Sequence, residues 1–186
     1  LVEGLRLAHR PREPVPLAAA ARERLRAPDL PTIAIVGAGA AALGLLIGPL
    51  VGALLPRLHD TAVPVDDLGL GLGIGADIGT VLVVVGLVPL GEELLFRGVL
   101  VGAWARAGRP GIGIFVSAAL FGLAHITVGP RAIAVMVLLG ALLAGAMLLS
   151  RSLGAPVLAH ALVNAIALLD AGLSGVVPIV VLAVTA

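Results

Sequence analysis

Apolar stretches alternate with short polar segments along most of this chain of 186 residues. A helix needs roughly 20 apolar residues to cross a hydrocarbon layer about 30 Å thick. The pattern therefore predicts an all-α, polytopic membrane helix bundle with about six transmembrane helices, of which the last two are short for complete spans. The predicted spans are residues 33–55, 68–104, 112–128, 132–149, 156–169 and 176–186.

Composition supports the membrane prediction and excludes a soluble domain. Hydrophobic residues make up 60% of the chain and charged residues 12%, and the mean hydropathy is +1.16. The 25 glycines fit helices that pack through small residues, because lipid supplies no hydrophobic drive for helices to associate. The absence of cysteine excludes disulfides and thiolate metal ligands.

The chain divides into a short polar segment and one membrane domain. We expect the domain to cover residues 32–186, with its motif-bearing core at residues 87–164. Residues 1–31 form an arginine-rich N-terminal segment, either cytosolic or lying at the membrane interface, with no apolar core of the kind that a signal peptide needs. All 12 basic residues are arginine, which we interpret as a bias of genome composition.

The arginines also predict the orientation, because cytoplasmic loops carry an excess of basic residues. With the N-terminal segment in the cytoplasm, the acidic 56–67 loop and Asp170 lie outside, and only Arg57 and Arg131 disagree with the rule. We therefore expect a multi-pass protein of the bacterial plasma membrane with both termini in the cytoplasm. The arginines that this orientation places inside are Arg106, Arg109 and Arg151.

Glu92 and Glu93 interrupt an otherwise apolar stretch, and Arg97 follows four residues later. Ionisable groups at membrane depth are costly, so they are functional candidates. Residues at spacing i, i+4 share a helix face, so Glu93 and Arg97 can form an ion pair that offsets the cost of burying either charge. Glu92 lies about 100° round the helix, backed by Phe96, where its carboxylate can take a proton from water.

Two further pairs have the same spacing in other apolar segments, Phe121 with His125 and His160 with Asn164. With Glu92, these side chains supply what water-mediated peptide hydrolysis needs: a base, a second group to hold the water, and donors for the oxyanion. Spacing indicates which face a residue occupies but not what it contacts. Convergence of the three segments is therefore an assumption at this point.

Each residue also has a purely structural interpretation. A single histidine or Asn164 can serve as a hydrogen bonder between membrane helices, and Asp77 can face the outer boundary of the membrane. We expect Pro89 to bend its helix just before the two glutamates and Trp104 to anchor the same helix at the interface. The joint occurrence of three pairs, in segments with little other polarity, favours a site over packing.

The three motifs resemble the signatures of the CPBP family of CAAX proteases and bacteriocin-processing enzymes, also called Abi-type intramembrane proteases. The resemblance covers residues 87–164, including the proline three residues before the first glutamate. One such motif alone is weak, whereas three in order within a multi-spanning chain are specific. The signatures E-E-x-x-x-R, F-x-x-x-H and H-x-x-x-N occur here as Glu92-Glu93-Leu94-Leu95-Phe96-Arg97, Phe121-Gly122-Leu123-Ala124-His125 and His160-Ala161-Leu162-Val163-Asn164.

The resemblance implies an intramembrane endopeptidase whose site opens toward the cytoplasm. Glu92 is the implied general base, and His125 is implied to hold and polarise the water. The resemblance assigns the oxyanion hole to His160 and Asn164. The residues implied to support the motif structurally are Glu93, Arg97 and Phe121.

Members of this family have been described both as metalloproteases and as glutamate proteases. Glu92, His125 and His160 would make a two-histidine, one-carboxylate zinc set. The His-Glu-x-x-His spacing of common zinc peptidases is absent, and no carboxylate is evident in the sequence that would hold either histidine from behind. We therefore favour a metal-free glutamate mechanism without a cofactor, and keep zinc as the alternative.

The expected substrate is a membrane-embedded or lipidated peptide or protein, cut near its C-terminus within the lipid bilayer; no nucleic-acid partner is expected. Two other classes of function stay open. A non-catalytic membrane scaffold or immunity protein would keep the motifs for packing, although the intact motif set argues against it. A small transporter or proton pathway would use intramembrane Glu and His as relays, and the absence of inverted repeats argues mildly against that class.

Overall fold

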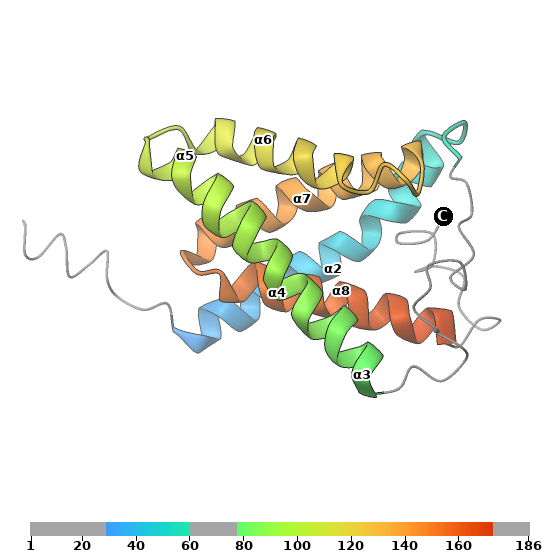
Figure 1. The fold of residues 1–186 in the computed structure, drawn as a ribbon, viewed down its shortest axis with the longest axis horizontal. Helices are drawn as coiled ribbons and strands as arrows, with labels where there is room; N and C mark the ends of the chain where they lie inside the picture. Colours follow the sequence, from blue (N-terminus) through green and yellow to red (C-terminus); the bar gives the residue numbers. More distant parts are fainter. Residues whose placement is uncertain (1–28, 60–77, 173–186) are drawn as a thin grey trace, which may run out of the picture.

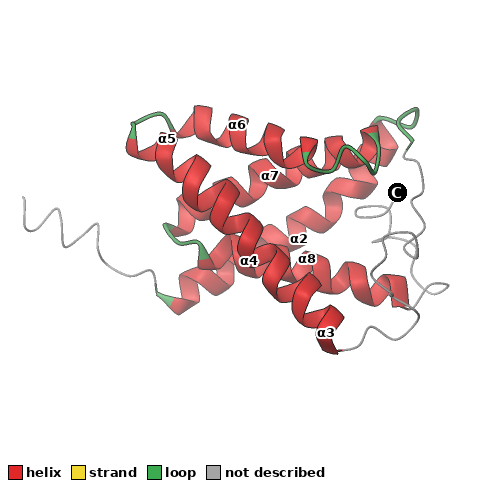
Figure 2. Ribbon diagram, viewed as in Figure 1, coloured by secondary structure: helices red, strands yellow, loops and turns green. Residues whose placement is uncertain are grey.

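The computed structural model describes residues 29–59 and 78–172, and this part of the chain is built from helices joined by turns (Figure 2). Residues 1–28 of the N-terminal segment lie outside the described residues. The same is true of Asp77 and of the predicted span 176–186. The helical elements are α2 (Leu30–Leu54), α3 (Ile78–Val81), η2 (Leu82–Leu87), α4 (Val88–Glu93), η3 (Leu94–Val101), α5 (Gly102–Arg106), α6 (Pro110–Leu123), α7 (Pro130–Ser150) and α8 (Gly154–Gly172).

The elements α3 to α5 follow one another without a break and form one long helix, here called the motif helix (residues 78–106). This helix crosses the bundle obliquely in front of α2 and α8 (Figure 1). α6 packs along α7, and α2 packs against both α7 and α8. Successive helices of the described residues run in alternate directions between the two ends of the bundle (Figure 1).

The described helices confirm the all-helical class and correct one detail of the predicted spans. α2 and α7 are long and apolar enough to cross a membrane, whereas Pro110–Leu123 and Gly154–Leu169 are shorter apolar helices. α8 nevertheless has 19 helical residues in all, which at about 1.5 Å per residue gives roughly 28 Å. The predicted bounds, 156–169, are thus too narrow by two residues at the start and three at the end, whereas the expectation that the apolar part of this helix is short is confirmed.

α6 ends sooner than its hydrophobic pattern predicts. The helix stops at Leu123, and residues 124–128 form turns before Gly129 and Pro130 begin α7. Gly129 has φ 137°, a value that residues with a Cβ rarely adopt. His125 therefore lies in a turn and not on a helix face, which corrects the expectation that it shares a helical stripe with Phe121.

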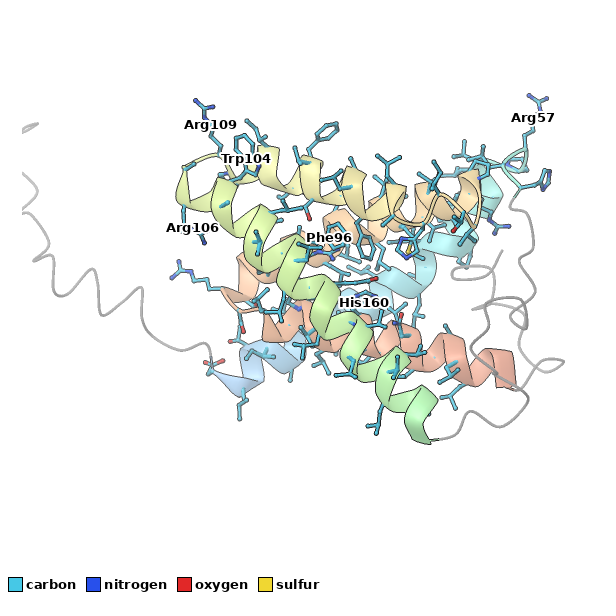
Figure 3. The ribbon with its side chains drawn as sticks, in the orientation of Figure 1. Arg57, Phe96, Trp104, Arg106, Arg109 and His160 are labelled. Carbon is cyan, nitrogen blue, oxygen red and sulfur yellow. The ribbon has the colours of Figure 1, made fainter. Side chains whose placement is uncertain are left out.

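Arginines lie at both ends of the bundle (Figure 3). Arg106, Arg109 and Trp104 lie at one end and Arg57 lies at the other (Figure 3). The α7–α8 turn, with Arg151, lies close to the arginine-bearing end of the motif helix, because both line the same cavity. α2 also starts at this end (Figure 1), with Asp29 capping its first turn through a 2.8 Å bond from the Thr32 N–H. We call this the arginine end.

Helices pack through small residues at several crossings, as expected where lipid offers no hydrophobic drive. The closest is between α6 and α7, where Gly122 is buried. A Cβ added there would lie 2.4 Å from Val137 Cγ2 and 2.9 Å from the backbone oxygen of Ile133. Gly122 thus sets how near the two helices can come.

Replacing Gly122 with alanine is expected to lower the free energy of unfolding by about 1–3 kcal/mol, the usual cost of overpacking. Part of the clash is with backbone, which cannot rotate away. Gly111→Ala is the matched control in the same helix, because no atom lies within 4 Å of its added Cβ. Reversible unfolding in mixed micelles measures both variants, and equal stability of the two would contradict the tight crossing.

Candidate active site

Two π-helical segments flank the short turn of α-helix that carries both glutamates. η2 precedes α4 and η3 follows it. Longer π-helical stretches are rare, and π-turns are frequent at functional sites. Within α4 the regular spacing of about 100° per residue still separates Glu92 from Glu93, so the two acids face different neighbours.

The π register explains how Asn164 is used. In this register each N–H bonds the carbonyl five residues back, as the N–H of Val88 does with the carbonyl of Val83. Pro89 follows and has no N–H, so the carbonyl of Val84, its partner in the register, needs another donor. Asn164 on α8 provides it, with Nδ2 2.9 Å from the Val84 oxygen. The motif asparagine therefore ties α8 to the motif helix.

Glu93 and Arg97 form the predicted ion pair, with Arg97 Nη1 2.8 Å from Glu93 Oε1 and both side chains fully buried. Arg97 also donates from Nη2 to the backbone oxygen of Gly140 on α7, at 3.2 Å. The same Glu93 oxygen lies 2.9 Å from Nδ1 of His160. One oxygen of Glu93 thus accepts hydrogen bonds from side chains on two helices, Arg97 on η3 and His160 on α8.

His160 lies between the two glutamates. Its Nδ1 faces Glu93, and its Nε2 is 3.7 Å from Oε2 of Glu92. The longer separation is beyond hydrogen-bond length, which is the range in which a bridging water is expected. Glu92 is the more accessible acid, with 30% of its side chain exposed against none for Glu93.

This geometry corrects one expectation from the sequence. Glu93 accepts a hydrogen bond from Nδ1 of His160. The expectation that neither histidine has a carboxylate partner was therefore wrong for His160. With the Nδ1 proton donated to Glu93, Nε2 is the nitrogen presented to Glu92. Glu93 therefore acts on His160 as well as on Arg97.

Aromatic side chains surround the buried charges. Phe121 is fully buried and packs edge-on against Phe96, with ring centroids 5.2 Å apart. Its ring also contacts His125 at 5.2 Å and His160 at 5.8 Å, and the Arg97 guanidinium lies 4.5 Å from its centroid. Phe121 thus sits at the centre of the motif residues and keeps water from the ion pair.

His125 reaches this cluster from its turn after α6. Its Nδ1 lies 2.9 Å from the backbone oxygen of Phe121, which fixes the ring through a local bond. The side chain is half-buried, so Nε2 is the nitrogen left to meet a ligand. The contacts bring Glu92 and His160 together directly, whereas His125 joins them through the Phe121 ring.

Two supporting residues are absent from the sequence prediction. Ser117 is fully buried, and its hydroxyl donates to the backbone oxygen of Phe96 in η3 at 2.9 Å. It is the single polar residue of α6, four residues before Phe121 and on the same face, which is a signal that could have found it. Gly140 takes part only through its backbone, and no sequence pattern indicates that role.

The side chains of the alternative zinc set do not form a ready ligand group in the described part of the chain. No group of three or more His, Cys, Asp or Glu side chains in residues 29–59 and 78–172 lies so as to hold a metal ion. Glu92, His125 and His160, the implied zinc set, are therefore not gathered as ligands. His160 turns its two nitrogens toward different carboxylates.

The apolar helical bundle buries an ion pair and a histidine beside a half-buried glutamate, an arrangement of the kind found in enzyme sites. Residues 75–166 match the family model described as Type II CAAX prenyl endopeptidase Rce1-like. The chain thus carries an Rce1-like domain, and this domain belongs to the membrane-embedded CAAX protease family that the motifs predicted. Neither a curated protein nor a solved structure matches the chain.

The bond between Asn164 and Val84 can be tested by coupling it to Pro89. Asn164→Ala is expected to lower the free energy of unfolding by about 1–3 kcal/mol, because the Val84 carbonyl loses its donor. In a Pro89→Ala background the new N–H can reach that carbonyl, so the cost of Asn164→Ala should shrink. A double-mutant cycle measures the coupling, and additive effects would contradict the shared carbonyl.

Proposed function

We propose that this protein is an intramembrane endopeptidase in which Glu92 activates the water that cleaves a peptide bond. The observation that carries the proposal is the placement of His160, held at Nδ1 by Glu93 and separated by 3.7 Å at Nε2 from Glu92. A water molecule on the open side can hydrogen-bond to both groups. Membership of the domain in a peptidase family supports the reaction class.

The proposed reaction uses Glu92 twice. Its carboxylate takes a proton from the water while the oxygen attacks the substrate carbonyl, and the protonated acid then gives that proton to the leaving amine. His160 acts in its doubly protonated form, in which Nδ1–H is donated to Glu93 and Nε2–H stabilises the negative charge that develops on the carbonyl oxygen. Asn164 also donates to this carbonyl oxygen, through the second hydrogen of its amide nitrogen, since the first is donated to the backbone oxygen of Val84.

The remaining motif residues prepare these groups. Glu93 and Arg97 hold His160 in one orientation, which a lone histidine on an apolar helix would not keep. His125, whose ring packs against Phe121 with the centroids 5.2 Å apart, helps to position the water. No metal ion is required by this mechanism, in which the carboxylate of Glu92 supplies the base.

We further propose that the arginine end faces the cytoplasm and that the substrate is a membrane-associated, lipidated protein cut near its C-terminus. The basic residues at this end support the orientation. The name of the matched family supports a prenylated substrate.

The function is tested by incubating the purified, reconstituted protein with quenched peptides that carry a prenyl or acyl group. We expect cleavage of lipidated peptides and little cleavage of the same peptides without lipid. Treatment with a chelator is expected to leave the rate unchanged. Absence of cleavage with every substrate would contradict the peptidase proposal, whereas loss of cleavage on chelation with recovery on adding zinc would contradict the metal-free mechanism.

A further inference from the structure

A cavity of about 350 Å³ opens at the arginine end, between the motif helix and the α7–α8 turn. Its size is within the roughly 300–1,000 Å³ of small-ligand sites. Gly98 and Gly102 form one wall, and Met147 and Leu153 contribute apolar surface from α7 and the turn. Neither Glu92 nor His160 lines this cavity.

Positive charge surrounds this mostly apolar space. Arg151 lines the cavity, is exposed, and has no ion-pair partner within the described part of the chain. Arg106 reaches back over the glycine wall, since a Cβ at Gly102 would lie 3.2 Å from its Nη1. Ser152 also lines the cavity, and its hydroxyl accepts from the Gly154 N–H, which leaves its own proton to donate.

The buried arginine of the motif lies at the bottom of the same cavity. Arg97 is among the lining residues, and its Nε is a buried N–H with no hydrogen-bond partner among the described residues. Its two terminal nitrogens are occupied by Glu93 and Gly140. The Nε–H of this fully buried guanidinium is thus left without an acceptor. An unpaired buried donor is costly, because it has lost its hydrogen bonds to water.

The backbone of Arg151 gives a separate indication that its side chain has a use. The residue ends α7 in the left-handed region, with φ 54° and ψ 29°. This position at a helix end is usually glycine, which adopts it without strain. An arginine here is unfavourable for the backbone alone, which is consistent with a contact made by its side chain.

We propose that this cavity binds the phosphate of an anionic membrane phospholipid, with the first carbons of its chains against Met147 and Leu153. A ligand with one negative group and an apolar remainder matches arginines at the rim and apolar walls. Trp104 and Arg109 lie at the same end (Figure 3), a combination typical of the membrane interface, where lipid phosphates are found. The proposal does not depend on the peptidase activity.

The test uses the full chain, reconstituted with equal amounts of phosphatidylglycerol and phosphatidylcholine of matched chains. Native mass spectrometry then counts the lipids that stay bound. We expect phosphatidylglycerol to be retained preferentially, and Arg151→Gly to weaken this retention about fivefold, the usual effect of one basic residue near an anionic surface. Arg151→Gly should also fold normally, because glycine relieves the left-handed backbone.

Two further variants separate a site from diffuse surface charge. Gly102→Leu is expected to fill the cavity and abolish the preference while it keeps every arginine. Arg109→Gln is the matched control, since Arg109 is exposed at the same end and is absent from the cavity wall; it should retain the lipid. Equal loss in Arg109→Gln, equal retention of both lipids, or displacement of the lipid by millimolar inorganic phosphate would overturn the lipid assignment.

Discussion

Glu92→Gln is expected to lower the rate of peptide cleavage by about 10²–10⁴-fold, the contribution typical of a general base. Glutamine keeps the shape and polarity of the side chain but cannot accept the proton of the attacking water. The loss should appear in kcat, because the proton moves only during the reaction. Substrate affinity should change little.

The fold should tolerate this substitution. The Glu92 side chain is 30% exposed and its contact with His160 is long, so the free energy of unfolding should stay within about 0.5 kcal/mol of wild type. Cleavage of a lipidated peptide and unfolding in micelles are measured on the same preparation. Wild-type cleavage by Glu92→Gln would remove Glu92 from the proposed role, whereas a joint loss of activity and stability would show a structural one.

Arg97→Met is expected to lower the free energy of unfolding by about 3–5 kcal/mol, the cost of removing one partner from a buried ion pair. Glu93 would then keep a buried charge with only His160 beside it. The Gly140 carbonyl would lose its donor as well. Such a loss is a large share of the total stability of most proteins.

A second substitution distinguishes the unpaired charge from lost packing. Glu93→Gln combined with Arg97→Met removes the buried charge and should recover most of the stability, because the uncompensated charge is the main cost of breaking a buried pair. Activity should not return, since His160 loses the carboxylate that orients it. Arg109→Met, at an exposed position, is the control and should change stability little; an equally stable Arg97→Met would contradict the importance of the pair.

The sequence predicted the local part of this architecture well. Glu93 and Arg97 are four residues apart on one helix, and helical geometry alone brings such residues together. The order of the three motifs then predicted the family, which the match to residues 75–166 confirms. These features depend on spacing along the chain, which is the information that a sequence holds most directly.

Contacts between distant segments could not be predicted in the same way. Glu93 and His160 are 67 residues apart, and nothing in their helices specifies which nitrogen of the ring meets which acid. The π register is also invisible in an apolar stretch, where hydropathy does not distinguish it from an α-helix. The turn at His125 was missed because it is built largely from apolar residues, whereas turns are recognised by their polar residues, glycines and prolines.

The shared oxygen of Glu93 has a consequence for how the protein is made. Synthesis begins at the N-terminus, so the motif helix leaves the ribosome before α7 and α8 exist. Until Gly140 and His160 arrive, Glu93 and Arg97 have only each other to offset the cost of entering lipid, about 2.5–3.5 kcal/mol for a single charged residue at the centre of a helix. The burial of both charges of the motif helix is thereby completed only when α8 packs against it, and biogenesis should stall in chains truncated before residue 160.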